Sequence, residues 1–175
     1  MTTHRHDLDR NEILFSYNAT IEDDGTLLVS FPGPPDSFYE GGTFQVKITL
    51  PTEYPYKSPS VGFLTRVYHP NVDEQSGSIC LDVISKTWSP MFSLKNIIDS
   101  FLPQLLQYPN ADDPLNHSAA KLFQSNPDQY EKKVRQYVQT YALAEEEDSL
   151  SNSTLSNASN ESNLSNASSV STLIL

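Results

Sequence analysis

Apolar and polar residues alternate between positions 43 and 50. Phe44, Val46, Ile48 and Leu50 are separated by single polar residues, which places the apolar set on one face of an antiparallel strand. Three shorter strand-like runs, separated by turn-forming Gly, Pro and Asp residues, are expected at 19–22, 27–31 and 60–63. The pattern predicts a four-stranded antiparallel meander whose apolar face needs a cover.

A helical apolar stripe follows later and is long enough to cover that face. Its members have the i, i+3, i+4, i+7 spacing of a buried helix face: Leu94, Ile97, Ile98, Phe101, Leu102, Leu105 and Leu106. Ser93 is a suitable N-cap. Pro103 lies inside the stripe and costs roughly 3 kcal/mol in a helix interior, so a kink or an early end is expected.

The two ends of the chain differ. Residues 1–14 are mostly polar and predict one short helix that is held weakly to the body. Asn126–Pro127 starts another helix with proline at its first position. The apolar face of this helix is expected to carry Tyr130, Val134, Tyr137, Val138 and Tyr141. Strands followed by helices indicate an α+β fold.

The composition changes after residue 143. Segment 144–175 contains no Lys, Arg, Gly, Pro or aromatic residue and repeats LSN at 150, 155 and 164. Such a segment buries too little apolar surface to offset the entropy of ordering. We therefore expect one domain of ordinary size over 1–143 and a disordered, acidic, Ser/Asn-rich tail over 144–175.

Charge and cysteine content narrow the function classes. All 11 Lys and Arg precede residue 144, together with 17 of the 22 acidic residues, and an acidic body argues against nucleic acid as a partner. One cysteine allows no internal disulfide or zinc cluster, which favours the reducing cytoplasm or nucleus. No apolar run is long enough for a signal sequence or a membrane span, so no membrane partner is expected.

The only cysteine, Cys80, lies nine positions after the tripeptide His69-Pro70-Asn71. Residues 65–90 show no period, and so long an irregular connection suggests function. A cysteine near a histidine suggests a nucleophile and a base, although a lone cysteine is ordinarily buried and inert. The residues between 69 and 80 do not decide between these interpretations by themselves.

Several motifs together resemble the catalytic fold of ubiquitin-conjugating enzymes over residues 19–141. They are Tyr54-Pro55, Pro59, His69-Pro70-Asn71, Ile79-Cys80-Leu81, Trp88 and Asp113-Pro114-Leu115. The resemblance implies a four-stranded antiparallel meander sheet packed against a central helix, with a short N-terminal helix and two C-terminal helices. Segment 101–116 and the acidic tail resemble the H-type subfamily, which partners the GID/CTLH ligase and was linked to histone conjugation.

The resemblance implies that Cys80 accepts ubiquitin as a thioester and yields it to a lysine of a protein substrate, usually with a ubiquitin ligase. Thiolates attack well, and thioesters stay reactive toward amines. A ubiquitin-activating enzyme upstream would use the ATP, so no bound cofactor or metal is expected. Two alternatives remain: conjugation of another ubiquitin-like modifier, and a non-catalytic adaptor that binds ubiquitin or a ligase.

Two further positions match the family's chemistry. Asn71 would donate its amide to the oxyanion, an effect worth about 3 kcal/mol in comparable sites, or would merely pin its loop. Asp113, and less directly Asp112, would orient the incoming lysine and assist its deprotonation, or would merely start a turn. Residues that flank the cysteine groove are expected to be Leu81, Asp82 and Leu115.

His69 has two interpretations. A papain-like mechanism would make it the base for Cys80. Pro70-Asn71 would fix the backbone there, and no helix start is expected after Cys80 to form an oxyanion site, so we expect a packed, hydrogen-bonded histidine. Trp88 is expected to pack beneath the cysteine loop.

Two loops match those through which ligases dock on the family. The first contains Pro55, Tyr56 and Lys57, and the second contains Ser89, Pro90 and Met91. Tyr56 would be an exposed anchor, or a core tyrosine with a solvent-facing hydroxyl. Two departures from the family concern docking rather than chemistry. Arg5 and Arg10 are the only Lys or Arg residues in the expected, truncated N-terminal helix, and Phe38 replaces the usual proline in the loop 35–42.

Overall fold

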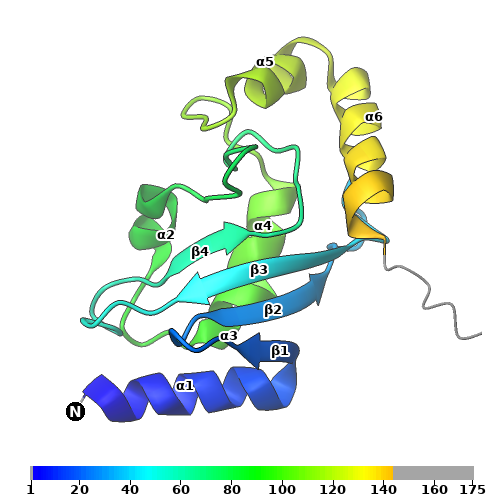
Figure 1. Ribbon diagram of the computed structural model, residues 1–175. Coiled ribbons are helices and arrows are strands. Elements are labelled where there is room, and N and C mark those ends of the chain that lie inside the picture. Colours follow the sequence, from blue (N-terminus) through cyan, green and yellow to red (C-terminus); the bar gives the residue numbers. More distant parts are fainter. Residues whose placement is uncertain (1, 144–175) are drawn as a thin grey trace, which may run out of the picture. The chain divides into compact units, whose positions relative to one another are not determined.

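The computed structural model describes residues 2–143 and contains one four-stranded antiparallel sheet (Figure 1). The strands are paired in chain order, and their bounds are β1 Asn18–Ile21, β2 Leu27–Pro32, β3 Thr43–Thr49 and β4 Ser60–Phe63. Val46 pairs with Val29 on one side and with Phe63 on the other. The predicted meander is confirmed, and the predicted disorder of segment 144–175 concerns residues outside the described range.

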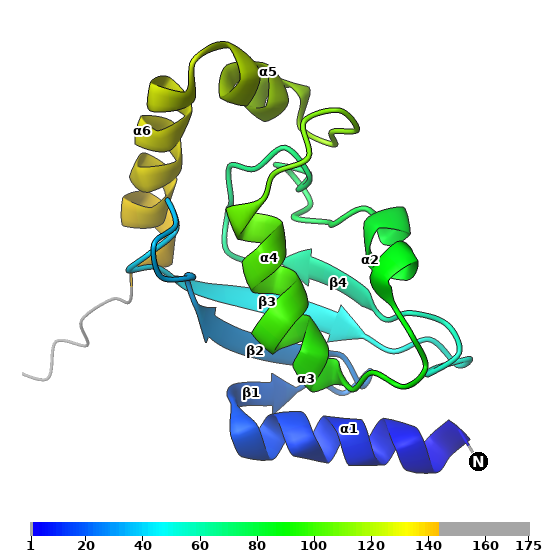
Figure 2. The ribbon, with the colours of Figure 1, turned by 180° about the vertical axis from the view of Figure 1, so that it is seen from behind.

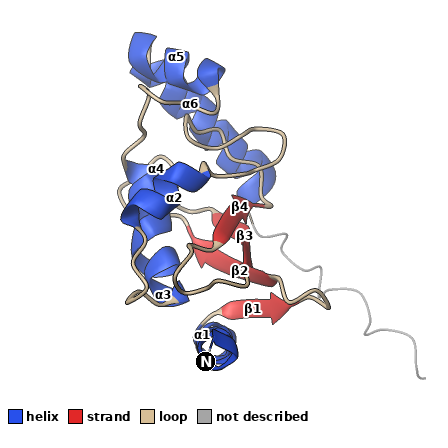
Figure 3. Cartoon of the chain, turned by 90° about the vertical axis from the view of Figure 1, so that its left-hand side faces the viewer, coloured by secondary structure: helices blue, strands red, loops and turns tan. Residues whose placement is uncertain are grey.

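One face of the sheet is buried beneath a single long helical segment. Its three consecutive parts are α3 Leu94–Asn96, the π-helical turn η1 Ile97–Phe101 and α4 Leu102–Gln107. Phe44, Val46 and Ile48 of β3 are buried in the same core as Leu94 and Leu102. Figure 2 shows α3 and α4 crossing in front of the strands, and Figure 3 shows them on one side of the sheet.

Pro103 changes the winding of this helix without ending it. The N–H of Leu102 donates to the carbonyl of Ile97, which closes the wider π-type turn directly before the proline. Pro103 then lies in the first turn of α4, where a missing N–H is tolerated. Of the two expected outcomes, a kink or an early end, the early end does not occur, because the helix continues to Gln107. The N–H of Ser93 donates to Asn96 Oδ1 at 2.9 Å at the helix start.

The N-terminal helix α1, Thr2–Ser16, is 15 residues long and is attached by polar contacts. Asp9 is buried and accepts hydrogen bonds from Tyr54 and from Arg5 Nε. The hydroxyl of Tyr17, just past the helix, donates to Asp99 at 2.5 Å. The predicted N-terminal helix is confirmed, and Ile13 adds a buried apolar contact to these polar ones. How weakly the helix is held stays a prediction.

The C-terminal part of the domain contains α5 His117–Ser125, α6 Pro127–Tyr137 and a π-helical turn, η2 Val138–Ala142. Asn126 caps α6 by accepting from the N–H of Gln129 at 3.1 Å, as its sequence predicts. Tyr130 and Val134 are buried against the core. Within residues 2–143, no helix is long and apolar enough to cross a membrane.

Candidate active site

A short hairpin joins the His-Pro-Asn tripeptide to the cysteine. Val72 and Ile79 form an antiparallel bridge, and the N–H of Asp73 donates to the carbonyl of Ser78 at 3.0 Å. The next facing positions in this register are Asn71 and Cys80. Directly opposite residues in antiparallel pairs have Cα atoms about 4.5–5.5 Å apart. The hairpin thus explains why the tripeptide and the cysteine are separated by nine positions.

Gly77 anchors the hairpin to β4. The N–H of Phe63 donates to the carbonyl of Gly77 at 2.8 Å. Gly77 has a φ of 69°, and a Cβ atom there would lie 1.8 Å from the carbonyl oxygen of Phe63. Only glycine fits this position without moving the backbone. The sheet edge therefore fixes the hairpin that carries Cys80.

Helix α2, Leu81–Thr87, begins directly after Cys80. Cys80 is its N-cap residue, and the N–H of Val83 donates to the Cys80 carbonyl at 3.1 Å. The expectation that no helix start follows the cysteine is therefore wrong, as is the expectation of an irregular segment throughout 65–90. A seven-residue helix is too short to show a clear apolar period. The Cys80 side chain is half-buried and its thiol is free.

His69 is fully buried, with 0 % of its surface exposed. Its Nδ1 accepts from the N–H of Asn71 at 3.0 Å, so the protonated Nε2 donates to the carbonyl of Leu105 at 2.8 Å. Burial lowers the pKa of His69 to about 4. Both ring nitrogens are engaged and the ring is neutral, so His69 has no free nitrogen to serve as a base for Cys80.

The side chain of Asn71 holds the loop that precedes α5. Its Oδ1 accepts from the N–H of Asn110 at 2.8 Å, and its Nδ2 donates to the carbonyl oxygens of Asn110 at 2.7 Å and Asp113 at 3.3 Å. Only 2 % of Asn71 is exposed. These contacts join residues about 40 positions apart in the chain. Asn110 is a partner that the sequence reasoning missed, since a hydrogen bond over this separation leaves no local pattern.

Backbone contacts continue this attachment. The N–H groups of Leu115 and Asn116 both donate to the carbonyl of Pro70 at 2.9 Å. Asp112 and Asp113 are exposed, and Leu115 is 40 % exposed rather than part of the core. The structure therefore brings the Asp-Asp-Pro-Leu segment to the tripeptide, whose last residue faces Cys80 across the hairpin. Leu81 and Asp82 follow the cysteine as the first residues of α2.

The two candidate docking loops lie together and expose large apolar side chains. Tyr56 is 77 % exposed and Met91 is 90 % exposed, which rules out Tyr56 as a core tyrosine. Lys57 and Pro90 are also exposed. The N–H of Met91 donates to Ser89 Oγ at 3.3 Å within the second loop.

Trp88 joins these two loops. Its Nε1 donates to the carbonyl of Pro55 at 2.8 Å, and its ring centroid lies 5.6 Å from that of Tyr54 and 6.3 Å from that of Phe92. The expected place beneath the cysteine loop is wrong, because Trp88 caps the far end of α2 from Cys80. Trp88 therefore packs at the candidate docking surface.

Both arginines of α1 donate hydrogen bonds to main-chain carbonyl groups of other segments. Arg5 Nη2 donates to the carbonyl of Phe92 at 2.7 Å, and Arg10 donates to the carbonyl of Gly25 at 3.1 Å. Arg5 thus links α1 to the second docking loop. Among the described residues, no group of three or more His, Cys, Asp or Glu side chains is arranged to hold a metal ion.

Comparison with known proteins agrees with this arrangement. The family model described as ubiquitin-conjugating enzyme matches residues 5–138. The chain belongs to the ubiquitin-conjugating enzyme family. It is 50 % identical over 157 residues to Ubiquitin-conjugating enzyme E2 5 of Arabidopsis thaliana, covering 87 % of this chain and 85 % of the relative. It is 51 % identical over 145 residues to Ubiquitin-conjugating enzyme E2-23 kDa of Triticum aestivum, covering 81 % and 79 %.

The same family is found among solved structures. The E2 domain of a Toxoplasma gondii ubiquitin conjugating enzyme superposes with a TM-score of 0.71 at 29 % identity, covering 80 % of this chain and 99 % of that domain. The predicted α+β fold of ubiquitin-conjugating enzymes is confirmed. The chain is thus a ubiquitin-conjugating enzyme, a transferase whose partner classes are ubiquitin, activating enzyme, ligases and protein substrates.

Proposed function

We propose that Cys80 is the residue that carries ubiquitin. Its thiolate attacks the thioester between ubiquitin and the activating enzyme, a new S–C bond forms, and the cysteine of the activating enzyme leaves as a thiolate. The observation that carries the proposal is the position of Cys80 opposite Asn71, whose side chain holds the Asp113 segment. ATP is consumed upstream by the activating enzyme, and Cys80 needs no cofactor or metal for this exchange.

The second step transfers ubiquitin to a lysine. The lysine nitrogen attacks the thioester carbonyl, the tetrahedral oxyanion collapses, the C–S bond breaks and Cys80 leaves as a thiolate. The nitrogen must lose a proton to become a nucleophile, and the exposed carboxylate of Asp113 orients it and assists this loss. Asp112 is the neighbouring acid with a lesser role. In this proposal Leu81, Asp82 and Leu115 belong to the sequence positions that flank the cysteine groove.

Asn71 has two parts in this mechanism. Its two contacts with Asn110 hold the loop, at 2.8 and 2.7 Å, and its contact with the Asp113 carbonyl is longer, at 3.3 Å. Because the amide group is planar, its N–H bonds have fixed directions, and donation to the oxyanion requires the whole Asn71 side chain to rotate. Pinning therefore describes the free protein, and donation is proposed for the tetrahedral intermediate, after the side chain has exchanged these contacts.

The thioester is tested by mixing the protein with activating enzyme, ATP and ubiquitin and separating the products on a non-reducing gel. We expect an adduct that reducing agent removes. Cys80→Ser should give no adduct, or an ester that resists thiols, since an oxygen ester is less reactive. A thiol-sensitive adduct on Cys80→Ser, or none on the unchanged protein, contradicts the proposal.

The amine step is tested with the preformed thioester and free lysine. Asp113→Ala should slow discharge without slowing formation of the thioester, because only the amine requires deprotonation. Asp112→Ala is the matched control, being an exposed acid one position away, and should have a smaller effect. Equal slowing of charging and discharge in Asp113→Ala would count against its proposed part.

We further propose that the enzyme serves a GID/CTLH-type ligase as an H-type member and works in the cytoplasm or nucleus. Segment 101–116 and the acidic composition after residue 143 support this proposal, as do the exposed side chains of Tyr56 and Met91 at the loops where ligases would dock. Purified GID/CTLH ligase should accelerate discharge of the thioester. Acceleration by an unrelated ligase alone would exclude this partner.

Residues 1–143 constitute the catalytic domain in this proposal. Removing residues 145–175 should leave charging of Cys80 unchanged, because the hairpin is held by hydrogen bonds to other residues within the described range 2–143. Charging measured on the shortened chain checks this. A large loss of charging would show that residues 145–175 contribute to the reaction.

A further inference from the structure

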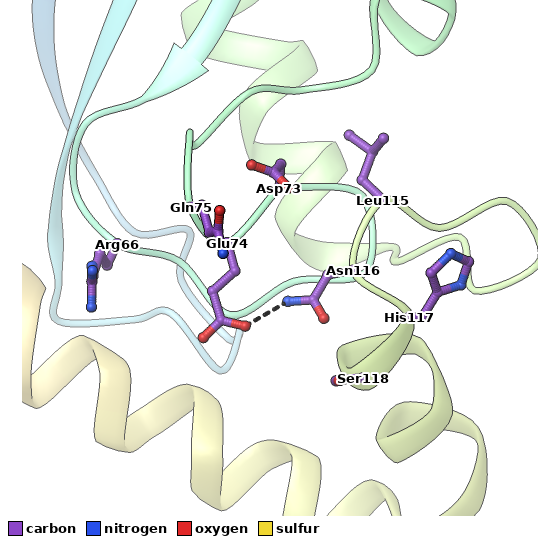
Figure 4. Close-up of a pocket in the computed structure, with 8 residues that line it drawn as sticks. All are labelled: Arg66, Asp73, Glu74, Gln75, Leu115, Asn116, His117 and Ser118. Atoms are coloured by element: carbon purple, nitrogen blue, oxygen red, sulfur yellow. Dashed lines mark hydrogen bonds between the residues drawn. The ribbon is translucent and has the colours of Figure 1, made fainter.

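A polar pocket of about 450 Å³ lies between the hairpin turn and the start of α5. Figure 4 shows Glu74 at its centre, with its carboxylate directed to the side-chain amide of Asn116. Arg66, Leu115 and His117 are among the other residues that line it. The pocket thus adjoins the segment that contains Asp113 and Leu115.

The carboxylates in this pocket are already engaged by the protein. Glu74 Oε1 accepts from the hydroxyl of Tyr137 at 2.5 Å, and Oε2 accepts from Asn116 Nδ2 at 3.2 Å. Asp73 Oδ1 accepts from the N–H and hydroxyl of Ser76 at 2.8 and 2.6 Å. Side chains bonded to one another in this way hold elements together, and would have to give up partners to bind a ligand.

Glu74 links the hairpin of the candidate active site to the start of α5. It belongs to the hairpin turn that separates Asn71 from Cys80. Asn116 caps α5, since its Oδ1 accepts from the N–H of Ala119 at 3.0 Å, and its own N–H donates to the carbonyl of Pro70. One carboxylate therefore ties the hairpin to the residue that directly follows the Asp-Pro-Leu segment.

Tyr137 gives this link a rigid support. Its ring centroid lies 5.4 Å from that of Tyr68, which is buried, and Tyr68 is the residue before the His-Pro-Asn tripeptide. The hydrogen bond to Glu74, followed by burial, raises the pKa of Tyr137 to about 12, so the phenol keeps its proton at neutral pH. Tyr137 of α6 therefore braces the hairpin from outside the site.

We propose that Glu74 is a positioning residue for lysine transfer, and that its bonds to Asn116 and Tyr137 hold the Asp113–Asn116 segment against the hairpin. Glu74 touches no reacting atom. The proposal rests on the proposed part of Asp113, because a brace for this segment matters only if the segment acts on the lysine. Misplacement of a reacting group by about 1 Å costs up to about 100-fold in rate.

The test measures discharge of the preformed thioester over a range of free lysine concentrations, beside the rate of charging. Glu74→Ala removes both hydrogen bonds and should lower the maximal discharge rate about tenfold, as expected for a displacement smaller than about 1 Å. The rate of charging should stay within about twofold of that of the unchanged protein. Tyr137→Phe and Asn116→Ser each remove one bond and should have smaller effects. Asn116→Ser keeps a side-chain oxygen that can cap α5.

Two controls separate positioning from general loss of structure. Gln75→Ala changes the exposed neighbour in the same turn and should discharge at the unchanged rate. Glu74→Gln keeps an acceptor for Tyr137 and should recover part of the loss. The backbone amide NMR signals of Asp113, Leu115 and Asn116 should shift in Tyr137→Phe. The pH profile of discharge should keep its shape in Glu74→Ala but change in Asp113→Ala.

The outcomes are distinguishable. Discharge by Glu74→Ala at the unchanged rate contradicts the proposed positioning by Glu74. A parallel loss of charging and discharge that follows the loss of thermal stability contradicts it as well. If Glu74→Ala discharges normally while Asp113→Ala is slow, the brace fails and the proposed function stands. If Asp113→Ala discharges normally, the proposed part of Asp113 fails on its own, whatever the result for Glu74.

Discussion

The cysteine end and the docking end of the molecule are held together by different forces. Around Cys80, irregular segments are fixed to one another by hydrogen bonds that His69 and Asn71 donate and that the Pro70 carbonyl accepts. At the docking loops, aromatic rings stack around Trp88 while Tyr56 and Met91 remain exposed. Chemistry requires fixed atoms, whereas recognition requires apolar side chains that are left uncovered for a partner.

The largest expected effect is at the hairpin. Gly77→Ala should cost about 4 kcal/mol, because an unfavourable φ and a steric overlap each contribute about 1–3 kcal/mol. Gly41→Ala is a matched control, since Gly41 has a φ of 83° but no atom within 4 Å of the added Cβ, and should cost only about 1–2 kcal/mol. Urea unfolding of the two variants measures the difference. Equal losses would mean that the hairpin yields as easily as an exposed turn.

The next effect is a pH dependence that belongs to the cysteine end. The pKa of His69 is about 4 in the folded protein, below its ordinary value of 6.5, so stability is fully present above pH 6.5 and falls as the pH decreases toward 4. The loss approaches about 3 kcal/mol once the pH is below the folded-state pKa. Unfolding free energies at pH 7, 5 and 4 measure this loss. A His69→Gln variant should show a flatter profile over the same range, and an equally steep one would assign the loss to other groups.

The smallest stability effect is expected at the docking end. Tyr56→Ala should change the free energy of unfolding by no more than about 0.5 kcal/mol, because the side chain is exposed. It should lower ligase-stimulated discharge about tenfold, as loss of an interface anchor does, and leave ligase-free discharge to lysine unchanged. Both discharge rates measured on one preparation decide the point. A fall in the ligase-free rate would show that the two ends are not separate.

Local patterns in the sequence predicted the sheet and its cover. Phe44, Val46 and Ile48 have a period of two and are buried on one face, and the stripe from Leu94 to Leu106 covers that face. The motif residues Asn71, Cys80 and Asp113 could be chosen because their joint spacing resembles a known family. The structure adds the hairpin register and the Asn71 contacts that relate them.

Features that depend on contacts between distant residues could not be predicted. The attachment of α1 relies on Asp9 and Tyr54, which are 45 positions apart, and the partner of Asn71 is Asn110, which is 39 positions away. Helix α2 has only seven residues, too few for a period to be recognised. Trp88 stacks on Tyr54 and Phe92 rather than beneath the cysteine loop, because the sequence does not indicate which aromatic rings contact one another.

The paired contacts of the Pro70 carbonyl have a consequence for how such a site can change over time. The N–H groups of Leu115 and Asn116 are main-chain donors, so most substitutions at these two positions leave both hydrogen bonds available. Main chain sets where the loop sits, and side chains set what it presents to an incoming amine. The preference for one substrate lysine over another can therefore diverge between lineages by substitution at position 115, while the loop keeps its position.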